Sequence, residues 1–220
     1  MPQISAFIFD LDGVITDTAE YHYRAWKRLA DEEGLPFSRE DNEALRGVSR
    51  RESLLRLLKG KVLPEAQMEE YMARKNAYYR AFLTQITAAD LLEGVADFLA
   101  QARAHGLKLG IGSASKNARD VLNGLGITDQ FDAIGDGYSV SRTKPAPDLF
   151  VWVAGRLGVP PAECVVFEDA EAGIAAAREC GMYSVGIGDP ARVGAADLIL
   201  PNLAGAQVDH ILSRLANLAH

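Results

Sequence analysis

The sequence predicts an α/β protein in which a Rossmann-like parallel sheet core carries an inserted all-helical cap domain. Three observations predict this architecture. Short apolar runs alternate with longer segments of helical periodicity, as in parallel βαβ construction. Most of the short runs stop at a cluster of polar or glycine residues, and one long segment near the N-terminus has helical periodicity alone. The 220 residues are 48% hydrophobic and 24% charged, which is ordinary for a chain that buries a core.

The candidate strands are short runs rich in β-branched, leucine and aromatic residues. In an open parallel sheet, the ligand crevice lies beyond the carboxyl ends of the strands. Because four of the runs are followed by polar clusters, we expect those clusters to converge on one site. The predicted strands comprise residues 6–9, 107–112, 133–134, 164–167, 184–187 and 198–200.

The segment from residue 18 to residue 82 contains no convincing strand. Tyr21 and Leu29 fit one helix, Leu54 and Leu58 fit a second, and Tyr71 with its neighbours fits a third. A helical block between the first strand and the next βα unit is typical of an insertion. The predicted division is a core of residues 1–16 and 82–220 and a helical cap of residues 17–81.

Charge and composition exclude several classes of function. The net charge is −7 and no run of Lys or Arg is present, so a nucleic-acid partner is excluded. The N-terminal residues lack the pattern of a secretion signal, and no run approaches the ~18 apolar residues of a membrane span. Cys164 and Cys180 have no metal-binding spacing and fit buried thiols in a reducing compartment. We therefore expect a cytoplasmic monomer with no membrane partner.

Asp10-Leu11-Asp12-Gly13 follows the first predicted strand directly. Two carboxylates two residues apart point the same way in a strand, and Gly13 permits a sharp turn after them. Their repulsion is relieved by a cation between them or by a proton on one of them. A carboxylate is also a competent nucleophile toward phosphorus. A polar turn that merely ends a strand is the alternative, and the other strand ends weigh against it.

The other three clusters supply matching chemistry. Glu168 and Asp169 follow a strand and are candidate ligands for Mg²⁺, although Asp169 could instead cap the next helix. Ser113, Ser115 and neighbouring residues open a helix, where hydroxyl and N–H groups bind anions; a plain Ser115 cap is the alternative. Lys144 precedes Pro145 and could offset the charge of a phosphoryl group, or could be an ordinary solvated lysine.

These four pieces, in this order and spacing, resemble the haloacid dehalogenase superfamily of phosphotransferases over essentially the whole chain. Longer stretches are similar to the β-phosphoglucomutase branch of that superfamily, and the first continues past the strand end into the predicted cap. Arg51 departs from the branch, which has an acidic residue there. The stretches that carry the similarity are residues 9–22, 24–26, 47–50, 74–76 and 113–117.

The resemblance implies an Mg²⁺-dependent isomerase that interconverts β-D-glucose 1-phosphate and D-glucose 6-phosphate through β-glucose 1,6-bisphosphate and an aspartyl-phosphate enzyme. Asp10 would be the nucleophile and Asp12 the general acid and base. Ser113 and Lys144 would stabilise the transferring phosphoryl group. The implied metal ligands are Asp10, the backbone carbonyl of Asp12, Glu168 and Asp169.

The same resemblance implies that sugar phosphates and the sugar bisphosphate are the partners. Two alternatives remain within the superfamily: a sugar-phosphate phosphatase and a mutase acting on another sugar 1-phosphate. A non-catalytic sensor on the same fold is a third, which the presence of every catalytic carboxylate disfavours. The implied substrate-binding residues are Thr18, His22, Trp26, Gly47, Val48, Arg50, Ser53, Lys75, Ser115, Lys116 and Asn117.

Overall fold

The structure, a computed structural model, describes residues 3–218, and within them six parallel strands form one sheet in the order β3-β2-β1-β4-β5-β6. β1 lies between β2 and β4 and is buried along its whole length. Strands buried on both faces read as continuous apolar runs, which is why β1 is Ala-Phe-Ile-Phe. The strands are β1 (Ala6–Phe9), β2 (Lys108–Gly112), β3 (Ala133–Gly135), β4 (Cys164–Glu168), β5 (Tyr183–Ile187) and β6 (Leu198–Leu200).

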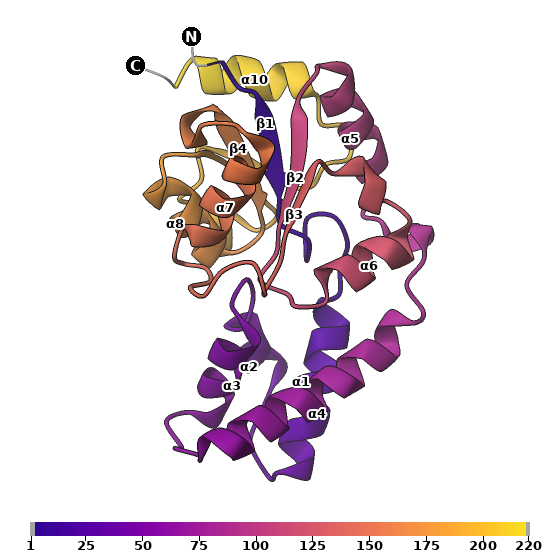
Figure 1. Cartoon of the computed structure of the whole chain (residues 1–220), viewed down its shortest axis with the longest axis vertical. Coiled ribbons are helices and arrows are strands. Elements are labelled where there is room, and N and C mark those ends of the chain that lie inside the picture. The colour runs from indigo at the N-terminus through magenta and orange to yellow at the C-terminus, as the bar shows by residue number, and fades with distance from the viewer. Residues whose placement is uncertain (1–2, 219–220) are drawn as a thin grey trace.

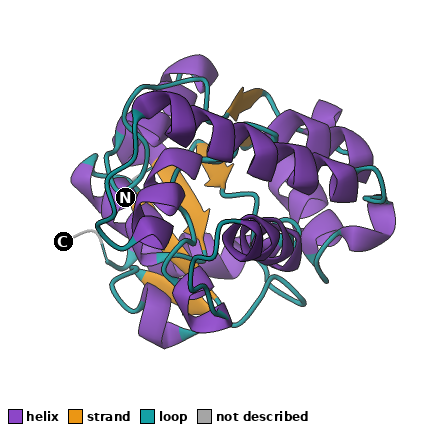
Figure 2. Cartoon of the chain, turned by 90° about the horizontal axis from the view of Figure 1, so that it is seen from below, coloured by secondary structure: helices purple, strands orange, loops and turns teal. Residues whose placement is uncertain are grey.

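Helices pack on both faces of the sheet, so the core has three layers (Figure 2). Phe7 and Phe9 of β1 point to the face that is covered by α5 (Val95–Ala104), α6 (Ala118–Leu125) and α10 (Val208–Ala216). Ile8 points to the opposite face, which is covered by α7 (Asp148–Leu157) and α8 (Glu171–Glu179). A short helix, α9 (Pro190–Val193), follows β5.

Four of the helices between β1 and β2 lie beyond the carboxyl end of β1 (Figure 1). Trp26, Leu54 and Met68 belong to a hydrophobic cluster of their own, which shares no residue with the two clusters around the sheet. None of the helices within residues 3–218 is long and apolar enough to cross a membrane. The four helices are α1 (Ala19–Glu32), α2 (Arg39–Glu43), α3 (Arg50–Leu58) and α4 (Glu65–Leu83).

The predicted strands are confirmed, with boundaries that differ by one residue at most at each end. The observed β2 begins at Lys108 instead of 107, because Lys108 is the first residue that pairs with β1. The observed β4 extends to Glu168, which pairs with Gly186 of β5. Glu168 is therefore part of the sheet, and Asp169 is the first residue beyond it.

Candidate active site

Asp10, the first residue after β1, lies in a buried cluster of charged side chains at the carboxyl end of the sheet. Its carboxylate Oδ1 accepts a 2.5 Å hydrogen bond from Lys144 Nζ, which also donates to Glu168 Oε2 at 2.7 Å. Burial alone would lower the pKa of Lys144, but the two carboxylates beside it raise that pKa above its ordinary value. Lys144 therefore carries a full positive charge next to Asp10.

Glu168 and Asp169 complete the cluster from the end of β4. Burial, and then the neighbouring Asp10 carboxylate, raise the pKa of Asp169 to about 6. The backbone fits closely around these carboxylates. A Cβ added at Gly13 would lie 2.3 Å from Asp169 Oδ2, and one added at Gly173 would lie 2.0 Å from Glu168 Oε2. Glycine at both positions leaves the space that the two carboxylates occupy.

The cluster has the chemistry of a site for a hard divalent cation. One oxygen each from Asp10, Glu168 and Asp169 lie within 4.8 Å of one another, and all three residues are buried. Buried carboxylates repel one another and need positive charge nearby. Lys144 supplies one such charge from within the cluster. An oxygen-only donor set with excess negative charge fits Mg²⁺.

Arg46, in the segment between α2 and α3, reaches into the cluster from the helical segment. Its guanidinium Nη1 donates to Asp169 Oδ2 at 3.2 Å, and its Nε donates to Glu43 Oε2 at 2.8 Å. The first bond joins the helical segment to the residue after β4, and the second lies within the helical segment. The sequence analysis did not select Arg46. Arg46 directly precedes residues 47–50, one of the stretches that carry the family resemblance, and this position could have indicated it.

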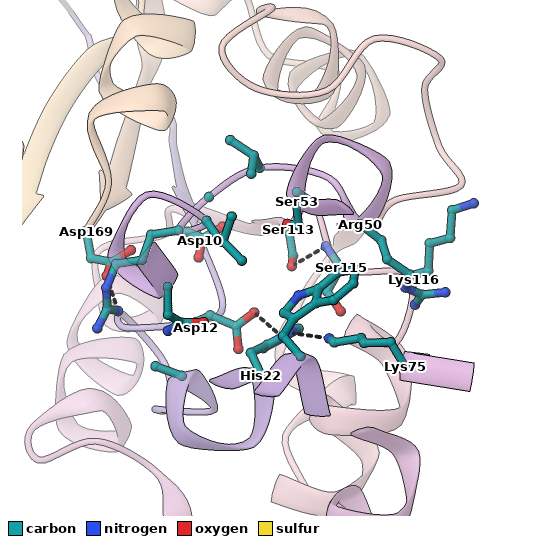
Figure 3. A pocket seen from close by; sticks show the side chains of 18 residues that line it. Asp10, Asp12, His22, Arg50, Ser53, Lys75, Ser113, Ser115, Lys116 and Asp169 are labelled. Atoms are coloured by element: carbon teal, nitrogen blue, oxygen red, sulfur yellow. Dashed lines mark hydrogen bonds and ion pairs between the residues drawn. The ribbon is translucent and has the colours of Figure 1, made fainter. Parts of the chain in front are cut away.

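Asp12 lies near Asp10 and lines the same cleft (Figure 3). Its carboxylate accepts a hydrogen bond from the Thr18 hydroxyl, which in turn accepts one from the Tyr79 hydroxyl at 3.2 Å. Desolvation in the cleft, followed by repulsion from Asp10, raises the pKa of Asp12 to about 7. A carboxyl group with a pKa near neutral can both give and accept a proton at working pH.

His22, on α1, faces the second oxygen of Asp12, with 3.9 Å between His22 Nε2 and Asp12 Oδ2. Desolvation and the cations of Lys75 and Arg50 hold the pKa of His22 well below its ordinary value, so its ring is neutral. Lys75 Nζ lies 2.8 Å from His22 Nδ1. Burial, followed by repulsion from Arg50, lowers the pKa of Lys75 well below its ordinary value.

The far end of the cleft is rich in cations and hydroxyl groups. Arg50 and Ser53 come from the first turns of α3, and Ser115 and Lys116 come from the loop before α6. Burial lowers the pKa of Arg50 below its ordinary value, but a guanidinium group stays charged. Arg51 points elsewhere and pairs with Glu65 through two hydrogen bonds at the surface. The departure at Arg51 therefore does not disturb Arg50.

The loop after β2 connects the two ends of the cleft. Ser113 is buried, its backbone N–H donates to Gly135 of β3, and its hydroxyl accepts the Ser115 N–H at 3.1 Å. The Ser115 hydroxyl accepts the Asn117 N–H at 3.2 Å. These turns hold the loop in one conformation, with Ser113 toward Asp10 and Lys116 toward Arg50 (Figure 3).

The sequence model of the haloacid dehalogenase-like hydrolase family matches residues 4–181 of the chain. The chain belongs to this family. The matched residues include the helical segment and strands β1 to β4, and therefore all four strand-end motifs.

Within the family, the chain is 44% identical to β-phosphoglucomutase of Bacillus subtilis (strain 168) over 90% of this chain and 89% of that protein. It is 34% identical to fructose-1-phosphate phosphatase YqaB of Escherichia coli (strain K12) over 83% of this chain and 96% of that protein. The crystal structure of β-phosphoglucomutase from Clostridium difficile superposes with a TM-score of 0.95 at 40% identity, covering 98% of this chain and 99% of that one.

The structure brings most of the residues selected from the sequence into the cleft described above. Four others lie behind its wall: Lys144 and Glu168 contact Asp10 or each other, Thr18 bonds Asp12, and Asn117 donates to Asn76 of α4 at 2.9 Å. The selected residues that line the cleft are Asp10, Asp12, His22, Trp26, Gly47, Val48, Arg50, Ser53, Lys75, Ser113, Ser115, Lys116 and Asp169. Sequence reasoning missed five lining residues, namely Ala19, Asn42, Leu45, Arg46 and Ala114.

Proposed function

We propose that the protein is a β-phosphoglucomutase that interconverts β-D-glucose 1-phosphate and D-glucose 6-phosphate through β-glucose 1,6-bisphosphate. One observation carries the proposal. A single cleft has the Asp10 cluster at one end and Arg50 with Lys116 at the other. A mutase must hold two phosphates at once, one at the reacting carboxylate and one out of reach of it.

In this proposal, the Asp10 carboxylate attacks phosphorus and becomes an aspartyl phosphate. Lys144 and Ser113 stabilise the negative charge of the phosphoryl group during transfer, because they are fixed in place before the reaction. The 2.5 Å contact between Lys144 Nζ and Asp10 supports this role for Lys144. Asp10 thus carries the phosphoryl group between the two positions of the sugar.

Mg²⁺ is the metal that we propose for the buried carboxylates. Asp10, Asp169 and the backbone carbonyl of Asp12 would hold it, with Glu168 assisting while it also binds Lys144. When bound, the ion neutralises charge on the oxygens of the phosphoryl group. Three buried carboxylates supply the oxygen donors. The charges of one lysine and a nearby arginine do not fully offset theirs, which supports this assignment.

Asp12 is the proposed general acid and base. It protonates the sugar oxygen that leaves phosphorus and later deprotonates the hydroxyl that attacks it. Thr18 and His22, both carried by the helical segment, contact or face its two carboxylate oxygens. We propose that residues 17–81 act as a cap domain whose closure over the substrate sets Asp12 in its working position and excludes water.

The distal phosphate is the proposed ligand of Arg50, with Ser115, Lys116 and Asn117 on the facing loop. The planar guanidinium group binds two phosphate oxygens at once, and it does so equally for a 1-phosphate and a 6-phosphate. Ser53, Lys75, Trp26, Gly47 and Val48 would then surround the sugar itself. We further propose that the enzyme acts in the cytoplasm as a monomer.

A sugar-phosphate phosphatase is the second candidate. It is favoured by the 34% identity to fructose-1-phosphate phosphatase YqaB, a protein that shares the family and most of the chain length. The difference between the two functions is whether a sugar hydroxyl or water takes the phosphoryl group from Asp10. The same nucleophile serves both reactions.

The test is an incubation with β-D-glucose 1-phosphate, Mg²⁺ and a trace of β-glucose 1,6-bisphosphate. We expect glucose 6-phosphate to form much faster than free phosphate, as measured in parallel by a coupled dehydrogenase assay and a phosphate assay. Asp10→Asn should abolish both products, and α-D-glucose 1-phosphate should react poorly. Release of phosphate without glucose 6-phosphate would replace the mutase with the phosphatase.

A further inference from the structure

Two hollows meet at the ion pair between Arg46 and Asp169. The first is the cleft described above. The second has a volume of ≈ 400 Å³ and opens on the core side, next to Gly13 and α9. Among the lining residues in the described part of the chain, Arg46 and Asp169 alone belong to both hollows. The ion pair between them is therefore the partition between the two spaces.

Arg46 is held in place by Glu43, which in turn binds an arginine that lines the second hollow. Arg46 donates to Asp169 Oδ2 at 3.2 Å and to Glu43 Oε2 at 2.8 Å. Arg192 of α9 lines the second hollow and binds the same Glu43 oxygen at 3.1 Å. The chain Asp169–Arg46–Glu43–Arg192 thus runs from the core to the helical segment and back to the core.

The second hollow suits water better than a phosphorylated ligand. Asp17, Glu93 and Asp169 give its lining a negative charge that Arg46 and Arg192 only partly offset, since both guanidinium groups are already paired. A polar hollow of this size, open to solvent, holds water. Asp169 belongs to the same cluster as Asp10, so this water lies one side chain away from the reacting carboxylate.

We infer that Arg46 seals the reacting carboxylate against the second hollow and thereby decides between phosphoryl transfer to the sugar and hydrolysis. Arg46 acts by blocking a path for water, in addition to the cover that the cap provides. The inference rests on the proposed aspartyl phosphate. In the hydrolysis that Arg46 suppresses, the oxygen of water forms the new bond to phosphorus and the bond from phosphorus to Asp10 breaks. The electron pair returns to the carboxylate, and the water protons leave with inorganic phosphate, in equilibrium with solvent.

The lifetime of the phosphoenzyme tests this inference directly. The enzyme is loaded with acetyl phosphate in saturating Mg²⁺ without sugar, the donor is removed, and the decay of phosphoenzyme is followed by quenching and intact mass spectrometry. We expect Arg46→Ala to decay about tenfold faster than the parent, the scale of one lost charge-assisted hydrogen bond. Glu43→Gln keeps Arg46 but weakens its support, so its decay should lie between the two.

Arg51→Ala is the matched control. Arg51 is a cap arginine in an ion pair with Glu65 at the surface, away from both hollows, and its loss should leave the decay unchanged. The Mg²⁺ dissociation constant of each variant, measured by calorimetry, separates leakage of water from loss of metal. A faster decay at equal Mg²⁺ occupancy supports the seal.

Three outcomes would overturn the seal: an unchanged lifetime in Arg46→Ala, an equal change in Arg51→Ala, or a faster decay that disappears once Mg²⁺ occupancy is matched. Failure of the proposed function gives a different result. In that case the parent forms a phosphoenzyme but yields no glucose 6-phosphate from β-D-glucose 1-phosphate, and the decay of Arg46→Ala still decides whether the partition excludes water.

Discussion

Lys144 supplies the positive charge that two buried carboxylates at the strand ends share. Its ammonium group is fully buried, bonds both Asp10 and Glu168, and lies 4.8 Å from the centre of the Phe150 ring. Glu168 is equally buried. Without Lys144, the two buried carboxylates would lose their shared counter-charge. The catalytic role that we propose for Lys144 and its structural role would therefore coincide in one side chain.

Replacing Lys144 with Ala should lower the free energy of unfolding by about 3–5 kcal/mol in EDTA, because removing one partner of a buried ion pair leaves the other uncompensated. Urea denaturation followed by circular dichroism measures the change. Lys27→Ala is the control, since the exposed Lys27–Asp31 pair contributes about 0.5 kcal/mol or less. Similar losses in the two variants would contradict the interpretation of Lys144 as a buried counter-charge.

At the scale of single elements, α8 has a glycine in its first turn, where the side chain of Glu168 occupies the space that a larger residue would fill. Gly173 is buried in the first turns of α8, where the side chain of Glu168 folds back against it. Glycine in a helix costs about 1 kcal/mol relative to alanine. Despite this cost to the helix, glycine at position 173 leaves the space in which Glu168 reaches Lys144.

A matched pair of Gly→Ala substitutions separates the two effects. Gly155→Ala in α7, where an added Cβ meets nothing within 4 Å, should stabilise the protein by about 1 kcal/mol through helix propensity. Gly173→Ala should instead destabilise it by roughly 1–3 kcal/mol, the usual cost of overpacking, and should lower phosphoenzyme formation by displacing Glu168. Thermal unfolding and the acetyl phosphate assay test both; stabilisation by Gly173→Ala would refute the argument.

The end of α5 and the start of α10 are joined by an ion pair that depends on pH. His105 Nε2 lies 2.8 Å from Asp209 Oδ1, and His105 Nδ1 lies 2.8 Å from the Gln101 carbonyl oxygen. The Gln101 carbonyl and the Asp209 carboxylate raise the pKa of His105 above its ordinary value of 6.5. A raised pKa means that the folded state binds the proton more tightly than the unfolded chain does.

The stabilisation from His105 should therefore be complete below pH 6.5 and should disappear as the pH rises through the raised pKa. Asp209→Asn should lower the urea midpoint in acid and match the parent at alkaline pH. The effect should be small and should weaken further in high salt, because Asp209 is exposed. A difference between parent and variant that grew with pH would have the wrong sign for this pair.

On the scale of the whole molecule, the helical segment and the sheet meet at the cleft, and Ala25, Tyr79 and Leu83 of the helical segment also pack into the hydrophobic cluster on one face of the sheet. The helical segment has its own cluster around Trp26, while the sheet has one cluster on each face. The contacts between the parts near the cleft are polar: Thr18 and His22 with Asp12, and Arg46 with Asp169. Polar contacts of this kind can be exchanged for contacts with substrate, which suits the cap closure that we propose.

Mg²⁺ should stabilise the whole fold, because a cation that binds the folded cluster and not the unfolded chain adds stability by mass action. At about 100 times its dissociation constant, the gain is about 2.7 kcal/mol. Thermal unfolding in EDTA and in increasing Mg²⁺ measures this gain. Asp169→Asn should remove most of the Mg²⁺ dependence, whereas Asp129→Asn, at an exposed turn, should keep it. Equal responses of the two variants would place the ion elsewhere.

Much of this arrangement could be predicted from the sequence, because the periodicity of side chains follows from local backbone geometry. The β1 run Ala-Phe-Ile-Phe, the helical spacing of residues 18–82 and the strand-end carboxylates at Asp10 and Asp169 are all local features. Parallel pairing then requires that strand ends share one edge, so the convergence of Asp10 with Asp169 followed as well.

The sequence by itself determined the strands, the helical insertion and the carboxylates at the strand ends. The tertiary structure alone decided that Lys144 bridges Asp10 and Glu168, that Arg46 bonds Asp169, and that Arg50 faces the cleft while Arg51 does not. The physical reason is distance along the chain. Asp169 and Arg46 are 123 positions apart, and no local preference encodes a contact that exists only once the helical segment and the sheet have met.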